Sequence, residues 1–266
     1  MGVWLTTVIW VLIMASLVGC GHFDIIKPKS PQASKLQLLQ ARYDENLAKL
    51  GNRWPSRSDC DAVLWASISK HGGNDVDITE SQAESGQWFR RPGKDCFSTA
   101  SSRSSFSNDM ALGIVLAAST HDIKRWFNWV KRNNYRMGPG DPGAAVLKPN
   151  VMAVIGRRVG WNLGPRYPYV SNSRDYVRHI QTLMIYVDGL STGYITKGEL
   201  SLLKRYNDGR DYLIASVLAK YTGDFDAAVG LLLEEGEPPS YVRGDSPEMF
   251  RLAHWVMSAK IVLGVK

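Results

Sequence analysis

Helical periodicity runs through this chain and restricts it to a small set of folds. From residue 34 onward, apolar residues recur every three to four positions, which is the spacing of one face of an α-helix. No segment alternates convincingly between apolar and polar residues, as a half-buried strand does. Turn signals such as Gly164-Pro165 and Pro238-Pro239 separate the periodic segments. The sequence therefore predicts an all-α fold, with helices over 34–50, 58–70, 108–119, 123–133, 150–159, 174–187, 197–206, 209–220, 224–235 and 247–263.

The stretch from about residue 74 to 107 is the least regular part of the chain. Residues 77–80 predict only a short helix, and seven of the ten residues from Ser98 to Ser107 are Ser or Thr. Ser107 and the acid that follows at Asp109 are typical of a helix start, where free backbone amides need acceptors. We expect an ordered loop that leads into a buried helix.

An internal similarity suggests how the helices pair. Residues 109–123 align without a gap on residues 211–225, and each copy describes a capped helix, a tight turn and a second capped helix. The identical pairs are Asp109/Asp211, Val115/Val217, Leu116/Leu218, Ala117/Ala219, Thr120/Thr222 and Asp122/Asp224. The offset corresponds to three hairpins of about 34 residues, within the range of helical repeats. We expect helical hairpins packed as an α/α array or a partial toroid; chance reuse of good turn residues is the alternative.

The first residues point to a targeting segment. Residues 3–18 are uncharged and mostly apolar, which suits the apolar core of a signal peptide and is short for a membrane span of about 20 residues. The run ends in Leu17-Val18-Gly19-Cys20, which resembles the bacterial lipobox. The resemblance implies cleavage before Cys20 and attachment of lipid, such as palmitate, to its sulfur. An uncleaved signal anchor is the alternative.

This resemblance divides the chain into three parts. It implies a signal peptide over residues 1–19, a lipidated Cys20 with a proline-containing tether over 20–33, and a single helical domain over 34–266. The protein would then reside in the cell envelope, lipid-anchored at the outer membrane or the cell surface.

The charge balance is basic but dispersed. The chain of 266 residues has 32 Lys and Arg against 25 Asp and Glu, a net charge of +7. The cations occur in scattered pairs such as Arg157-Arg158, and no aromatic-laced basic element is present in the sequence. For an exported protein, we expect contact with membrane headgroups, a glycan or an envelope protein, and no nucleic acid. An ordinary solvated surface gives the same pattern.

Three cysteines occur in the chain. If Cys20 carries lipid, Cys60 and Cys96 remain, and in an oxidising compartment they are expected to form a disulfide. Two buried free thiols are the alternative. The cysteine spacing does not match a zinc motif.

Common catalytic signatures are missing from the sequence. It has no Gly-x-Ser-x-Gly elbow, no His-Glu-x-x-His and no phosphate-binding loop. The five histidines share no metal-ligand spacing; they are His22, His71, His121, His179 and His254. We expect His179 and His254 to be ordinary helix residues, and we expect no metal and no cofactor.

The irregular region combines several residues suited to binding. Aromatic faces stack on sugars, and arginines hold carboxylates or sulfates through paired hydrogen bonds. The candidate binding residues are Trp88, Arg90, Arg91 and Arg103. A crosslinked, irregular loop is a common place for a binding site.

Three acids begin predicted helices. Asp109, Asp175 and Asp211 each lie at or near a helix start, and Asp175 and Asp211 follow an arginine. In a closed toroid these starts would converge on one rim, so we consider the three acids as candidate catalytic residues. Helix capping is the alternative role, because Asp is among the most favoured capping residues.

The hairpin pattern and the acidic helix starts loosely resemble the α/α-toroid enzymes that cut polysaccharides by hydrolysis or elimination. Two functions are therefore carried forward. The first is a membrane-anchored lipoprotein whose helical body binds a protein or glycan partner. The second is a polysaccharide-active hydrolase or lyase with an acidic cleft.

Overall fold

A computed structural model describes residues 25–26, 35–54, 60–94, 106–138, 145–171, 173–234, 236–239 and 248–265. This described part is all-α, as the periodicity predicts. Its α-helices are α2 (Leu36–Leu50), α3 (Ala62–Gly72), α4 (Asn108–Ala117), α5 (Thr120–Arg132), α6 (Pro149–Val159), α7 (Arg174–Thr192), α8 (Lys197–Tyr206), α9 (Tyr212–Thr222), α10 (Phe225–Leu233) and α11 (Glu248–Leu263). Among the described residues, no helix is both long and apolar enough to span a membrane.

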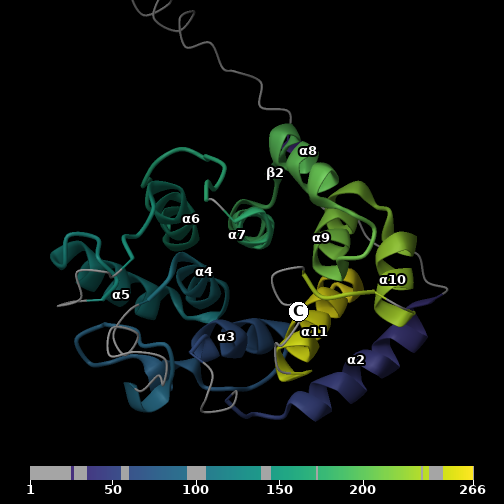
Figure 1. The fold of residues 1–266 in the computed structure, drawn as a ribbon, viewed down its shortest axis with the longest axis horizontal. Coiled ribbons are helices and arrows are strands. Elements are labelled where there is room, and N and C mark those ends of the chain that lie inside the picture. Colours follow the sequence, from purple (N-terminus) through teal and green to yellow (C-terminus); the bar gives the residue numbers. More distant parts are fainter. Residues whose placement is uncertain are drawn as a thin grey trace, which may run out of the picture.

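Five helices form a closed inner ring. α3 packs against α4, α4 against α7, α7 against α9, α9 against α11, and α11 against α3 (Figure 1). The remaining helices lie outside this ring: α5 and α6 on one side, α8 beside α9, and α10 and α2 on the other side. The predicted helical array is therefore closed by contact between the last helix and the first helix of the ring.

The inner helices run in the same direction, as contacts near both ends show. Near the helix starts, the Trp65 ring of α3 stacks on Phe250 of α11 at 4.4 Å between centroids. Near the helix ends, His71 Nε2 of α3 lies 2.9 Å from the Tyr186 hydroxyl of α7. The ammonium of Lys220 from α9 lies over the same tyrosine ring, 5.6 Å from its centroid. The starts of the inner helices therefore share one face of the ring and their ends share the other.

Small residues allow the inner helices to approach closely. A Cβ at Gly113 of α4 would come within 3.0 Å of Leu64 in α3, and one at Gly72 of α3 would come within 3.0 Å of Val256 in α11. Large apolar side chains fill the space around these contacts, including Leu64, Met110 and Val256, which are all fully buried. At native packing density, adding or removing even one methyl group disturbs the packing. These contacts therefore determine how the helices of the ring are placed.

The two similar segments share a turn but not their packing. α9 and α10 pack as a hairpin, whereas α4 packs on α3, α6 and α7 and makes little contact with α5. Gly223 ends α9 in the left-handed conformation at φ 84°, which reverses the chain sharply. The aligned residue His121 has a Cβ that disfavours this conformation. Accordingly, α5 has already begun at Thr120, and Ser119 rather than the predicted Asp122 caps it.

Part of the predicted tether pairs with the helical body. Strand β1 (Ile25–Ile26) pairs antiparallel with β2 (Ile195–Thr196), which immediately precedes α8. These strands have two residues each, too short for the alternation that identifies a strand in a sequence. The predicted signal peptide over residues 1–19 and Cys20 lie outside the described residues.

The irregular region also contains local structure. Asp77 accepts a hydrogen bond from the Thr79 amide and caps the short helix η2 (Ile78–Ser81), as the sequence predicts. A second single turn, η3, covers Pro92–Lys94. The described part of this region ends at residue 94, so the hydroxyl-rich stretch is covered only from residue 106 onward.

Candidate functional site

The three candidate catalytic acids lie at helix starts on the same face of the ring. Asp109 and Asp211 are only 2 % exposed, whereas Asp175 is exposed. Asp211 accepts hydrogen bonds of 3.0 Å from the amides of Leu213 and Ile214, the geometry of a capping residue. The Asp109 carboxylate accepts hydrogen bonds from the Ser107 hydroxyl and the Met110 amide. Two of the three carboxylates therefore serve their own helix starts.

The candidate binding residues are dispersed. Trp88 is fully buried next to η2, with no ring face open to a sugar. Arg90 donates hydrogen bonds to the Asp61 carboxylate at 2.9 Å and to the Cys60 carbonyl at 3.2 Å. Arg91 is buried too. Arg103 lies outside the described residues.

The predicted disulfide reaches beyond the described part. Cys60 lies half-buried at the turn before α3, next to the Arg90 guanidinium. Cys96 lies outside the described residues, as does the proposed lipidation site Cys20. The Cys60–Cys96 pairing therefore stays a prediction.

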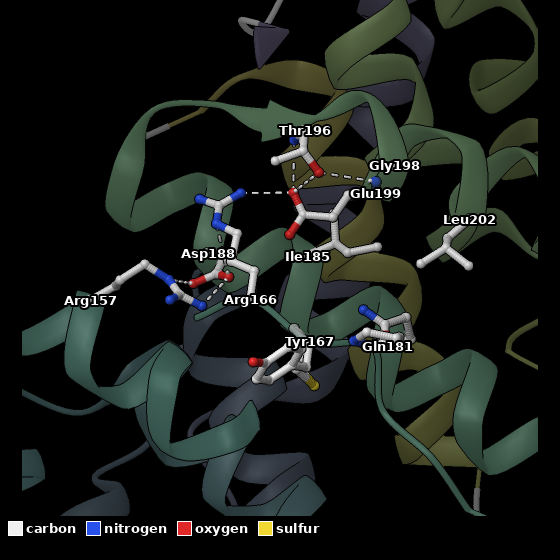
Figure 2. Close-up of a pocket in the computed structure, with 12 residues that line it drawn as sticks. Arg157, Arg166, Tyr167, Gln181, Ile185, Asp188, Thr196, Gly198, Glu199 and Leu202 are labelled. Atoms are coloured by element: carbon white, nitrogen blue, oxygen red, sulfur yellow. Dashed lines mark hydrogen bonds and ion pairs between the residues drawn. The ribbon is translucent and has the colours of Figure 1, made fainter. Parts of the chain in front are cut away.

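The structure presents a different candidate site, a cavity of about 210 Å³ between α7, the start of α8 and the segment 161–171 (Figure 2). We call it the ion-pair cavity. Its lining residues are Arg157, Arg166, Tyr167, Pro168, Gln181, Met184, Ile185, Asp188, Thr196, Gly198, Glu199 and Leu202.

Two arginines and two acids form a connected network along this cavity. Arg157 donates two hydrogen bonds of 2.6 Å to the two carboxylate oxygens of Asp188. Arg166 donates to Glu199 at 2.7 Å and lies 3.6 Å from Asp188, so it joins the two acids. A further hydrogen bond of 2.9 Å runs from Arg166 to the Thr192 hydroxyl. Figure 2 shows the guanidinium of Arg166 between the two carboxylates.

Local sequence explains why these groups are held in place. Glu199 is the third residue of α8 and forms a capping box with Thr196, accepting from its amide at 2.7 Å. Arg157 lies in the last turn of α6, where a cation is favoured by the helix dipole. Asp188 lies deep in α7, and its burial is tolerated because it is fully paired.

The charges of the network cancel, and this limits the kind of ligand that the cavity can bind. Two guanidiniums face two carboxylates, so a strongly charged ligand gains no net attraction. Donors and acceptors held in fixed positions instead match the hydroxyl groups of a sugar. Gln181 is held in the same way, since its carbonyl oxygen accepts from the Tyr169 amide at 2.5 Å. Tyr167 stands at the edge of the cavity with 59 % of its surface exposed, a ring on which a sugar can stack.

Sequence reasoning missed this site, although parts of its signal were present. Thr196 and Glu199 show the spacing of a capping box, and Asp188 is an acid within the apolar run of α7. In the sequence, Arg157 is only one half of a scattered basic pair, Arg157-Arg158. The meeting of α6, α7, α8 and segment 161–171 depends on tertiary packing, and no local pattern predicts it.

Among the described residues, no three His, Cys, Asp or Glu side chains come together as ligands for a metal ion. His179 and His254 are fully buried core residues whose Nε2 atoms lie 3.2 Å apart, in line with the expectation of ordinary helix residues.

In comparisons with known proteins, no family model, no curated protein and no solved structure matches this chain.

Proposed function

We propose that this chain is a lipid-anchored envelope protein whose helical body binds a neutral glycan in the ion-pair cavity. The observation that carries the proposal is the charge-balanced network of Arg157, Arg166, Asp188 and Glu199 beside the exposed ring of Tyr167. Rigid polar groups whose charges are paired, next to an aromatic face, are the chemistry that recognises sugar hydroxyls and the apolar faces of a pyranose ring.

The position of the tether supports the anchored arrangement. β1 pairs with β2, whose Thr196 lines the ion-pair cavity. Ile25 follows Cys20 by five positions, and an extended chain advances at most about 3.6 Å per position, or about 18 Å in total. A lipid on Cys20 would therefore hold the cavity near the membrane surface, where an envelope glycan is accessible.

The anchor is tested by labelling cells that produce the full chain with a radioactive or alkynyl palmitate. We expect label and a cleaved leader in the wild type, and neither in Cys20→Ser. Label retained by Cys20→Ser would contradict lipidation at this residue. Cys60→Ser is the control for loss of a cysteine: it breaks the predicted disulfide of Cys60 but leaves the predicted lipobox intact, so the label should remain.

The glycan site is tested by calorimetry on the detergent-extracted full chain, with chito- and cello-oligosaccharides as neutral probes and hyaluronan as an acidic probe. We expect binding of a neutral probe and about a fivefold loss of affinity in Tyr167→Ala, because one stacked ring contributes about 1 kcal/mol. Val170→Ala is the matched control, because Val170 is exposed in the same segment and does not line the cavity. Equal loss in both variants, or binding of hyaluronan alone, would contradict the proposal.

Polysaccharide cleavage is the second candidate function. The shared direction of the inner helices favours it, because the starts of α4, α7 and α9 lie on one face, as an acidic cleft requires. It would rest mainly on Asp175, whose side chain is exposed. New reducing or unsaturated ends, formed by the wild type and not by Asp175→Asn, would establish this function; no product from either protein would reject it.

A further inference from the structure

A second cavity lies at the face of the ring where the inner helices end, opposite the face that carries the three candidate acids. It has a volume of about 260 Å³ and is separate from the ion-pair cavity, with which it shares no lining residue. Its lining residues are His71, Val115, Leu116, Arg158, Val187 and Leu190. The wall is thus largely aliphatic, with Leu190 at its open side, 42 % exposed.

One cation lines this cavity and two more lie near its His71. Arg158 lines it directly, and the ammonium groups of Lys220 and Lys260 lie close enough to act on the His71 imidazole. All three side chains are half-buried. Burial lowers the pKa of both lysines, which shows that their charges are partly removed from water.

None of these three cations forms an ion pair with a carboxylate among the described residues. Arg158 donates one hydrogen bond, of 3.3 Å, to the Val115 carbonyl. The helix ends that meet here carry partial negative charge and favour nearby cations, which accounts for part of the arrangement. Arg158 and the two nearby lysines still leave an excess of positive charge that a bound anion would neutralise.

The neighbouring polar groups are already fixed. The Tyr186 hydroxyl and His71 Nε2 are 2.9 Å apart, and the same imidazole hydrogen-bonds to the backbone of Leu116. Burial first, and then Lys260, Lys220 and Arg158, lower the pKa of His71 to about 3, so the imidazole is neutral at pH 7. The neutral imidazole therefore adds no charge to the cavity, and Arg158 is the lining residue that can pair with an anion.

We propose that this second cavity, formed where α3, α4, α6 and α7 end, binds a small aliphatic carboxylate whose charged group pairs with Arg158 beside His71. The field of Lys220 and Lys260 attracts the carboxylate, and Val115, Leu116, Val187 and Leu190 contact its hydrocarbon part. The inference stands independently of the glycan site, because the two cavities are distinct.

The test is a titration of the full chain with butanoate, followed by calorimetry and by histidine NMR. We expect saturable binding and a rise in the pKa of His71, since a nearby anion favours the imidazolium. Arg158→Gln should weaken binding at least about tenfold, and Lys260→Gln should weaken it several-fold. Arg174→Gln is the matched control, because Arg174 is an exposed arginine at the opposite end of α7.

Inorganic phosphate is the comparison probe. Phosphate that binds as tightly as butanoate would overturn the aliphatic part of the proposal, because charge alone would then account for binding. No saturation with butanoate at 10-millimolar concentration (roughly the weak limit for a small ligand) would overturn the site. If Arg158→Gln fails to fold, Lys260→Gln and the pKa of His71 in the wild type decide the outcome.

Discussion

At the scale of single residues, the glycine of the inner helices with the least room for a side chain lies where α7 meets α9. A Cβ on Gly189 of α7 would overlap the hydroxyl of Tyr221 from α9. That hydroxyl is buried and forms no hydrogen bond with the described residues, and burial raises the pKa of Tyr221 to about 12. Only glycine thus fits at position 189 while the tyrosine keeps its hydroxyl.

We predict that Gly189→Ala lowers the free energy of unfolding by about 1–3 kcal/mol, the cost of overpacking a core. Tyr221→Phe alone should change the free energy of unfolding by less than about 1 kcal/mol, because the hydroxyl that is removed forms no hydrogen bond with the described residues. The double variant should recover at least half of the loss, since the overlapping atom is gone. Urea denaturation measures all three proteins, and strictly additive effects would contradict the contact.

At the scale of helices and turns, the sequence predicts most boundaries well. The helix over residues 197–206 is reproduced to the residue, because a capping box starts α8 and its apolar period stops at Tyr206. The expected similarity of the two segments fails at the turn, where His121 in the first segment aligns with Gly223 in the second. Local alignment recognises a turn, but left-handed backbone at one position decides whether the second helix folds back on the first.

This difference predicts opposite effects of the same substitution. Gly223→Ala should destabilise the protein by about 1 kcal/mol or more, because alanine is disfavoured at φ 84°. His121→Ala, at the aligned position in the first turn of α5, should be neutral or slightly stabilising, since alanine is the best helix former. Thermal unfolding of the two variants tests the prediction, and similar losses in both would contradict it.

At the scale of the whole molecule, contacts between distant parts of the chain carry what the sequence does not reveal. α11 closes the ring on α3, and the ion-pair cavity draws Arg157, Arg166, Asp188 and Glu199 from separate segments. Periodicity identifies each helix and its buried face. No local sequence pattern predicts which helix faces pack against each other. The candidate acids were predicted from their position at helix starts, and that position is common to catalytic residues and to caps.

The assembled ring also determines how the protein responds to acid. Three histidines are enclosed by the inner helices, and burial lowers the pKa of His71 to about 3, that of His179 to about 4, and that of His254 well below 6.5. In the unfolded chain these groups titrate near pH 6.5. Between about pH 4 and 6.5 the unfolded chain therefore binds more protons than the folded protein, so stability must fall as the pH falls.

We predict that the free energy of unfolding is constant between about pH 7.5 and 9 and declines below pH 6.5, with a slope of up to about 1.4 kcal/mol per pH unit for each histidine. Urea denaturation at a series of pH values measures the slope. His71→Gln should reduce this slope by the contribution of one histidine. The side chain is half-buried, and its removal leaves the His179–His254 contact in place. His121→Gln should leave the slope unchanged, because His121 is exposed on α5. If the free energy of unfolding of the wild type does not change from pH 7 to 4.5, these imidazoles accept protons in the folded protein. That result would contradict the burial of the three histidines among the inner helices.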